Sequence, residues 1–155
     1  MATDLETYFG EWKANLRGKH SFDRHRKAWP AWRVALRGVL REKLGSFPDK
    51  RTPLEATCLE RTECEGYVRE RVELTTFEGM RMPMYVLIPE DAGQRPVAAV
   101  LALHGHGYGS REICGLEPDG SPRDGDPGGH RDFAVSLVRR GFLVAAPELI
   151  GFGDR

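Results

Sequence analysis

The chain has 155 residues, and 23 lysine or arginine residues balance 23 aspartate or glutamate residues, so its formal net charge is zero. This length suits one domain with a single core, and a balanced charge creates no overall field that would attract nucleic acid or an anionic membrane. The longest apolar run, residues 97–103, is far shorter than the roughly 20 residues that cross a bilayer. We therefore expect neither nucleic acid nor a membrane as a partner.

The N-terminal residues and the cysteines indicate the compartment. The first residues include Asp4 and Glu6 and contain no apolar core, unlike a secretory signal. Cys58, Cys64 and Cys114 cannot all pair with one another, and none of them belongs to a CxxC motif. Free thiols are typical of a reducing environment, so we expect a cytoplasmic location.

Residues 1–53 are predicted to form an N-terminal helical segment. Thr3 and Glu6 have the spacing of a capping box, in which two side chains satisfy free backbone N–H groups at the start of a helix. Apolar residues then recur at helical spacing, which predicts an amphipathic helix over residues 4–18.

A second helix is predicted within residues 22–44. Pro30 stands either at its start or at a kink, and Gly45 suits the position after its end. Both helices are expected to pack as a cap, with their tryptophans buried in a core. These tryptophans are Trp12, Trp29 and Trp32.

A sheet is predicted within residues 54–155. Alternation over residues 68–76 indicates a half-exposed strand, with Val68 on one face and charged residues such as Arg69 on the other. Residues 82–89 then form the returning strand of an antiparallel hairpin.

Two apolar runs, residues 97–103 and 142–146, are typical of buried parallel strands. Between them, Asp126 is expected to cap a crossover helix, Pro127 to begin it and Gly141 to end it. The inner face of this helix is expected to comprise Phe133, Ala134, Leu137 and Val138. A hairpin followed by this βαβ unit predicts an α/β fold.

Residues 108–129 form a polar, glycine-rich segment that is too long for a plain connection, so we expect it to be functional. Ile113 and Leu116 are its main apolar anchors. With so few anchors, the segment is expected to be mobile when no ligand is bound.

The first buried strand ends in His104-Gly105-His106-Gly107. Because glycine has no Cβ, Gly105 and Gly107 are expected to adopt positive φ and to let the backbone come close to a substrate. Backbone N–H groups there would face the negative charge that develops on an oxygen atom in a transition state.

This motif, the crossover and the segment Ala146-Pro147-Glu148-Leu149-Ile150-Gly151-Phe152-Gly153-Asp154-Arg155 together resemble the front third of the α/β-hydrolase superfamily. The resemblance covers residues 66–155 and is greatest to the branch of dienelactone hydrolases and acetyl xylan esterases. It implies a carboxylic ester hydrolase that acts on a small-molecule ester through a serine acyl-enzyme, with no cofactor and no metal. It also implies a partial α/β-hydrolase sheet, to which the helical segment predicted above adds an N-terminal cap.

The resemblance assigns roles to individual residues. In the family, the residue after the His-Gly pair donates its backbone N–H to the oxyanion hole, which places this role at His106, between Gly105 and Gly107. His104 is expected to hold the loop by side-chain hydrogen bonds. The loop that shapes the substrate pocket is expected to begin with Tyr108, Gly109, Ser110 and Arg111.

The family's nucleophile is a serine in a G-x-S-x-G motif, which this sequence lacks. Ser110 is the serine nearest to the glycine motif, yet it precedes a long loop and has no oriented base beside it in sequence. His130 and Asp132 are expected to cap the crossover helix and to anchor the loop before it. With no nucleophile, acid or base identified, we expect a chain that stops before the nucleophile turn and is inactive alone.

The same resemblance places the nucleophile strand directly beside residues 97–103. Without that neighbour, an apolar strand becomes an open edge, which favours pairing with another chain. We therefore expect oligomer formation or aggregation through this edge.

Three alternatives remain open. In the first, the chain is a non-catalytic fragment or a pseudo-enzyme. In the second, His104 and His106 bind a metal ion, although no further ligand stands at a recognisable spacing. The candidate further ligands are His130, Glu112, Asp124 and Glu148. In the third, the glycines bind a dinucleotide, although Glu148 follows them at about twice the roughly 20 residues typical of such sites.

Overall fold

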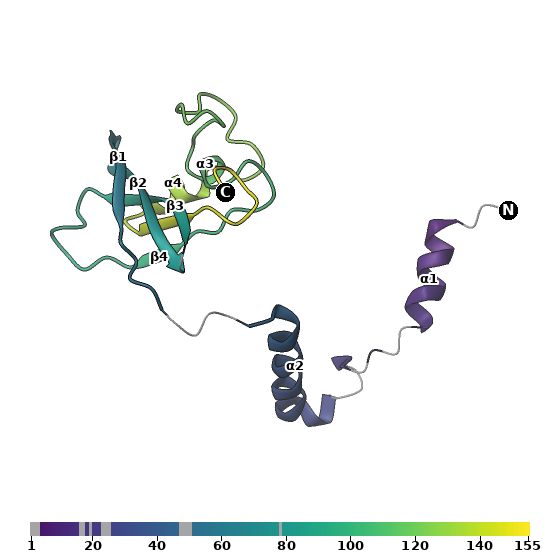
Figure 1. The fold of residues 1–155 in the computed structure, drawn as a ribbon. Coiled ribbons are helices and arrows are strands. Elements are labelled where there is room, and N and C mark those ends of the chain that lie inside the picture. Colours follow the sequence, from purple (N-terminus) through teal and green to yellow (C-terminus); the bar gives the residue numbers. More distant parts are fainter. Residues whose placement is uncertain (1–3, 16–17, 19, 23–25, 47–50, 78) are drawn as a thin grey trace. The chain divides into compact units, whose positions relative to one another are not determined.

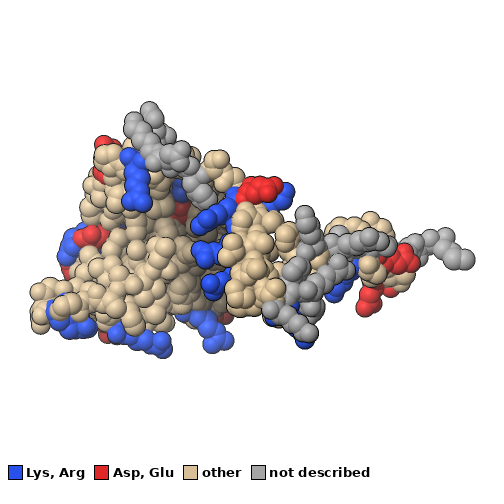
Figure 2. Space-filling view, turned by 90° about the horizontal axis from the view of Figure 1, so that it is seen from below, with Lys and Arg blue, Asp and Glu red and all other residues tan. Residues whose placement is uncertain are grey.

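The computed structural model describes residues 4–15, 18, 20–22, 26–46, 51–77 and 79–155. The chain divides into two units, Met1–Pro48 and Asp49–Arg155, which are described separately below (Figure 1). Figure 2 shows basic and acidic side chains dispersed over the visible face, with uncharged surface between them. None of the helices in the described ranges is long and apolar enough to span a membrane.

The N-terminal unit contains helices α1 (Leu5–Asn15) and α2 (Trp29–Leu44), with the short 3-10 helix η2 (Arg26–Ala28) directly before α2. Pro30 lies in the first turn of α2, so it starts this helix. Thr3, half of the predicted capping box, lies outside the described residues.

The tryptophans of this unit are more exposed than predicted. Trp12 is 57% exposed and Trp29 is 46% exposed, and α2 has no buried residue. The prediction that they occupy a core is therefore wrong for these two side chains. They contact neighbouring aromatic rings instead. Trp29 stacks on the half-buried Trp32 with centroids 5.2 Å apart, and Trp12 meets the ring of Phe9 at 6.4 Å. Two short amphipathic helices contain too few apolar side chains to enclose a core.

The C-terminal unit is built on a five-stranded sheet with the order β1-β2-β3-β5-β4. Its strands are β1 (Thr57–Cys64), β2 (Tyr67–Phe77), β3 (Met80–Pro89), β4 (Ala99–Leu101) and β5 (Leu143–Pro147). The pairs β1–β2, β2–β3 and β3–β5 are antiparallel, whereas the pair β4–β5 is parallel. The predicted hairpin and the parallel pair are thus confirmed, while β1 was not predicted.

The buried face of β2 differs from the one expected from its sequence. Tyr67, Arg69 and Thr75 are buried, whereas Val68 is only half-buried. The polar side chains therefore occupy the face that is covered. The reason is that this face receives the long loop and the crossover helix, and the aromatic Tyr67 belongs to their core cluster.

The crossover helix α4 (Phe133–Val138) begins later than predicted. Asp126 does not cap it, because its Oδ1 accepts a hydrogen bond from the N–H of Gly128 in a turn, 3.0 Å away. Arg131 and Asp132 have φ values of 50° and 45°, which a right-handed helix cannot include. Its inner face is as predicted, with Ala134 and Val138 buried and Phe133 and Leu137 packed beside them.

The segment 108–129 is better anchored than its composition predicts. It begins with the short helix α3 (Ser110–Ile113), and Leu116 forms a β-bridge with Pro122. Ile113 and Leu116 are 0% and 1% exposed. Fully buried anchors oppose local opening around these residues. The mobility of the segment without ligand stays a prediction.

The core of this unit lies between the sheet and helices α3 and α4. Residues of β3 and β5 supply one side of it, and these are Tyr85, Leu87, Val144 and Ala146. β4 forms one edge of the sheet, next to β5. Leu101 at the end of β4 is 65% exposed, and Leu103 just after it is 54% exposed. Apolar side chains on an unpaired edge are unusual in a stable monomer.

Candidate functional site

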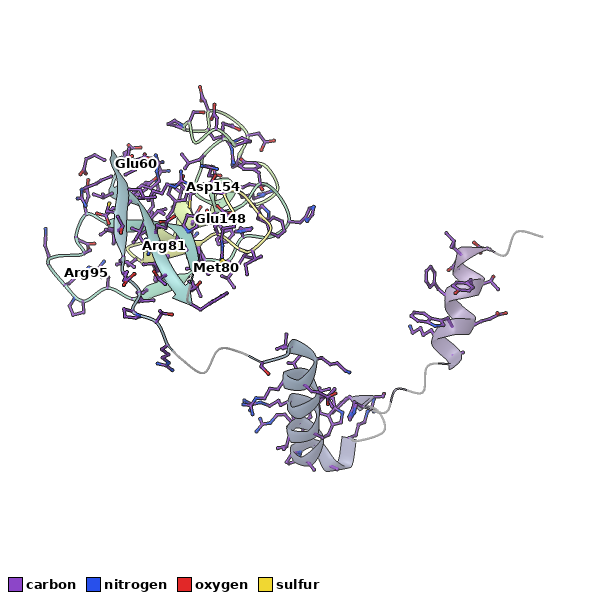
Figure 3. All side chains as sticks on the ribbon, viewed as in Figure 1. Glu60, Met80, Arg81, Arg95, Glu148 and Asp154 are labelled. Atoms are coloured by element: carbon purple, nitrogen blue, oxygen red, sulfur yellow. The ribbon has the colours of Figure 1, made fainter. Side chains whose placement is uncertain are left out.

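The candidate site lies where the two parallel strands end. The segment His104–Gly107 follows β4, and Glu148 follows β5, next to it in the sheet. Because parallel strands end at the same edge of a sheet, these segments meet in space although they are far apart in sequence. Figure 3 labels Glu148 and Asp154, which come from the C-terminal segment at this edge.

His104 has a structural role. Its ring is buried, and its Nδ1 donates to the carbonyl of Gly105 at 2.9 Å. Its Nε2 accepts the backbone N–H of Leu149 at 3.1 Å. Because this N–H can only donate, the proton of the neutral ring belongs on Nδ1. Both nitrogens are thus occupied by the backbone, as expected for a residue that holds the loop.

Glu148 connects the loops around the site. Its carboxylate is 2% exposed and accepts the N–H and the hydroxyl of Ser110, each at 2.8 Å. Oε1 also lies 3.5 Å from Nε2 of His104. Hydrogen bonds from several donors compensate a buried carboxylate for its lost water. Ser110 and Gly109 therefore contact Glu148 inside the protein. Neither the Ser110 hydroxyl nor the Glu148 carboxylate is accessible to a substrate.

The glycines are required for a different reason from the one predicted. Gly105 and Gly107 do not have positive φ. Instead, a Cβ at Gly105 would lie 2.7 Å from the His130 ring, and one at Gly107 would lie 1.8 Å from Oε2 of Glu112. The absence of side chains lets His130 and Glu112 pack directly against the loop backbone.

His106 is the exposed residue of the motif. Its carbonyl accepts a hydrogen bond from Nε2 of His130 at 3.3 Å, and its ring meets the edge of Phe152 at 5.8 Å. Within the described part of the chain, its backbone N–H has no hydrogen-bond partner. The N–H of His106 is thus free, while the carbonyl of the same residue is held in place. Such a donor can bind a developing oxyanion.

Tyr108 and its neighbours brace this loop from behind. The backbone N–H of Tyr108 donates to Oε2 of Glu112 at 3.2 Å, and its hydroxyl donates to the carbonyl of Leu116 at 2.8 Å. Arg123 donates to the Tyr108 hydroxyl and pairs with Asp132. Asp132 makes no capping hydrogen bond to α4, so it anchors the loop without capping the helix.

Arg111 is directed toward the C-terminal segment. Its two terminal nitrogens donate to the carboxylate of Asp154 at 3.1 and 2.9 Å, and Arg71 of β2 pairs with the same carboxylate. Two parallel N–H donors on one carboxylate make a geometrically specific pair. This pair fixes residues 149–155 against the sheet, so Arg111 positions the loop, and a contact of its side chain with substrate stays a prediction.

The potential metal ligands do not converge. Glu112 lies 3.9 Å from Nε2 of His130, and His104 is occupied by the backbone as described above. Among the described residues, no group of three or more His, Cys, Asp or Glu side chains lies close enough together to hold a metal ion.

Sequence reasoning missed the roles of three residues at this edge. Glu148 was considered only as a metal or ribose ligand, and Phe152 and Asp154 were not singled out. Phe152 lies between the rings of His104 and His106, at 5.2 and 5.8 Å. The sequence contained one signal for Glu148. An acidic side chain directly after an apolar strand is placed near the protein interior, where it needs hydrogen-bond donors as partners.

Comparison with known proteins identifies the fold and the family. The model of the abhydrolase family matches residues 9–154. A crystal structure from Bacteroides fragilis NCTC 9343, provisionally described as an acetyl xylan esterase, matches with a TM-score of 0.71 at 23% sequence identity. No match was found among curated proteins.

The structural match covers 99% of this chain and 39% of the other chain, so this chain spans well under half the length of the protein that it resembles. At this level of identity the likeness shows the fold. The family match extends over nearly the whole sequence and includes the loop of His104 and His106. The chain therefore belongs to the abhydrolase family.

Proposed function

We propose that this chain supplies the oxyanion-binding part of a carboxylic ester hydrolase that acts on a small-molecule ester. The backbone N–H of His106 is the proposed donor. The observation that supports this most directly is that the N–H has no partner within the described residues, although the residue's carbonyl is held by His130. Family membership and the likeness to the Bacteroides fragilis protein support the reaction class.

The chemistry explains why a backbone donor suits this position. When a nucleophile attacks an ester carbonyl, the electron pair of the C=O bond moves onto oxygen. The N–H stabilises this negative charge more than it stabilises the neutral ground state, so it lowers the barrier. One such preorganised donor contributes about 3 kcal/mol, which is more than a hundredfold in rate.

The proposed reaction proceeds through a serine acyl-enzyme. A general base takes the proton of the serine hydroxyl as the serine oxygen bonds to the acyl carbon, and passes it to the alcohol as the ester C–O bond breaks. The same base then takes a proton from water, which bonds to the acyl carbon, and returns it to the serine as the carboxylic acid product leaves. Ser110 does not fit this nucleophile, because it is 1% exposed and both its hydroxyl and its N–H are bound to Glu148. We propose that a longer form of the protein supplies the nucleophile, acid and base, and that no cofactor takes part.

The decisive experiment separates the His106 backbone from its ring in an ester-active longer form that contains this sequence. His106→Pro removes the N–H, whereas His106→Ala keeps it and removes the ring. Turnover of p-nitrophenyl acetate should fall by about 100-fold or more in His106→Pro and stay within about threefold of wild type in His106→Ala. Thermal unfolding of both variants checks that the fold is intact.

The opposite pattern would overturn the assignment. If His106→Ala loses about a thousandfold with its fold intact, the imidazole acts in the reaction and the backbone assignment fails. The 155-residue chain by itself is expected to show no turnover above the background rate. Saturable turnover by this chain, together with labelling by a serine-directed fluorophosphonate, would show that it contains a nucleophile after all.

A further inference from the structure

A buried arginine that forms no ion pair with any described residue lies on the inner face of the sheet. Arg69 is in β2, where it aligns with Leu87 of β3, and the residue is 7% exposed. Arginine keeps its proton in proteins, so this position places a full positive charge away from bulk water. Such a charge is costly unless an anion or several hydrogen-bond acceptors compensate for the lost water.

Other arginines on the same hairpin have carboxylate partners. Arg71, two residues further along β2, pairs with Asp154, and Arg81 of β3 lies 3.0 Å from Oε2 of Glu73. For Arg69, by contrast, neither an ion pair nor a hydrogen bond is found among the described residues. Its charge acts on the neighbouring Tyr67 and Cys114, which are uncharged groups.

Arg69 borders a cavity of about 410 Å³, which is within the size range of small-molecule sites. Tyr67 lines the cavity beside it, Cys114 and Arg123 come from the long loop, and Val135 comes from α4. Among the described residues, Arg111 Nε is the only solvent-inaccessible side-chain nitrogen or oxygen that lacks a hydrogen-bond partner. The guanidinium nitrogens of Arg69 therefore remain accessible, and the cavity supplies that access.

The other charges around the cavity are already paired. Arg123 is bound to Asp132, and its nitrogens also donate to carbonyl groups of the loop. At the rim, Arg139 lies 3.6 Å from Glu65, whose side chain is 95% exposed. Glu63, which also lines the cavity, lies 3.5 Å from Arg61 on the same strand. Arg69 is thus the one charged residue of the lining without an ion-pair partner among the described residues.

We propose that this cavity binds a small molecule with one carboxylate group, held by the guanidinium of Arg69. The planar guanidinium matches a carboxylate with two parallel N–H donors. One uncompensated cation suits a monoanion, whereas a phosphate dianion would bring excess negative charge next to Asp132. The apolar part of the ligand would contact Tyr67 and Val135.

The test is isothermal titration calorimetry of the purified protein with benzoate, and with benzamide as an uncharged analogue of the same shape. Benzoate should bind at least tenfold more tightly than benzamide to the wild-type protein. Arg69→Gln should weaken benzoate binding at least tenfold. Arg95→Gln is the matched control, because Arg95 is half exposed, pairs with Asp91 and lies outside the cavity lining, and it should bind benzoate within twofold of wild type.

A second measurement does not depend on the ligand. Arg69→Met replaces the uncompensated charge with an apolar side chain of similar length, so its midpoint of thermal unfolding without added anion should rise by several degrees. Added benzoate should raise the midpoint of the wild-type protein and leave that of Arg69→Met unchanged.

Several outcomes would overturn the proposal. Equal binding of benzoate and benzamide by the wild-type protein would show that no charge recognition occurs, whatever happens to the variants. If a folded Arg69→Gln protein binds benzoate as tightly as the wild type does, the ligand binds at a site other than Arg69. Tighter binding of inorganic phosphate than of benzoate would contradict the assignment to a carboxylate.

Discussion

The carboxylate of Glu148 accepts two hydrogen bonds from Ser110, one from its backbone N–H and one from its hydroxyl, each 2.8 Å long. Both residues are almost fully buried. The pair joins the start of α3 to the end of β5, two segments that come from opposite ends of the βαβ unit. The candidate oxyanion loop, which includes His106, comes directly before Ser110 in the chain, so this pair fixes the C-terminal end of the loop.

Removal of the Glu148 carboxylate should destabilise the fold strongly. Glu148→Ala leaves the N–H and hydroxyl of Ser110 buried without their acceptor, which should lower the free energy of unfolding by about 2–4 kcal/mol. Glu65→Ala, at a carboxylate that is 95% exposed, should change it by less than about 0.5 kcal/mol. Urea denaturation followed by circular dichroism measures both. Similar values for the two variants would show that the Glu148 contacts contribute nothing specific.

Gly109 should tolerate no side chain. It has a φ of +100°, and a Cβ there would lie 1.9 Å from Oε1 of Glu148. Gly109→Ala should therefore cost at least about 2 kcal/mol, from backbone strain together with displacement of the carboxylate. Gly129→Ala is the matched control, because nothing lies within 4 Å of its added Cβ and its φ is not positive. Thermal unfolding of the two variants compares them, and a lower midpoint for Gly129→Ala than for Gly109→Ala would contradict the geometry.

Tyr67 should make the fold sensitive to alkaline pH. Burial, assisted by a hydrogen bond with Cys64, raises the pKa of Tyr67 to about 12 from its usual value of 10.0. Between these pH values the unfolded chain loses this proton and the folded chain keeps it. The stabilising contribution is thus complete below pH 10 and is lost as pH rises toward 12.

The comparison with Tyr67→Phe isolates this effect, since phenylalanine cannot ionise. The free energy of unfolding should decline less steeply over this pH interval in the variant than in the wild-type protein. Urea denaturation at several alkaline pH values measures the two slopes. Identical slopes would show that Tyr67 ionises equally in both states.

The exposed edge of β4 should promote association of the 155-residue chain. β4 pairs only with β5 in the described sheet, and Leu101 beside this edge is 65% exposed. We propose that copies of the chain pair through it, and that Leu101→Lys shifts the population toward monomer. Leu59→Lys on the opposite edge strand, where Leu59 is 53% exposed, is the control and should leave association unchanged. Light scattering after size-exclusion chromatography reads out the mass; a monomeric wild-type protein would refute the idea.

The sequence allowed some elements to be predicted because their signals are local. The apolar runs around Val100 and Val144 specify a parallel pair, and the alternation after Val68 specifies a hairpin. β1 was missed because it is an edge strand, whose residues are mostly exposed and so need no apolar pattern. The early start of the crossover helix at Asp126 was also wrong, since the local cap signal was overridden by left-handed residues nearer to Phe133.

The candidate site could be predicted only in outline. The glycine motif pointed to His104 and His106 because its spacing is visible in the chain. The partners that define the geometry are separated from it by many residues: His130 packs on Gly105, and Glu148 binds Ser110. Their proximity depends on strand register and on the path of the long loop, neither of which a single sequence displays. The inversion of the β2 faces at Arg69 was hidden for the same reason.

The dependence of the glycine motif on Glu148 limits how far the motif can be transplanted. A synthetic peptide with the sequence of residues 104–110 has no carboxylate to bind the N–H of Ser110, and no N–H of Leu149 to fix the ring of His104. Such a peptide would sample many shapes in water. A designer who wishes to graft this loop onto another scaffold has to import a second, distant segment with it.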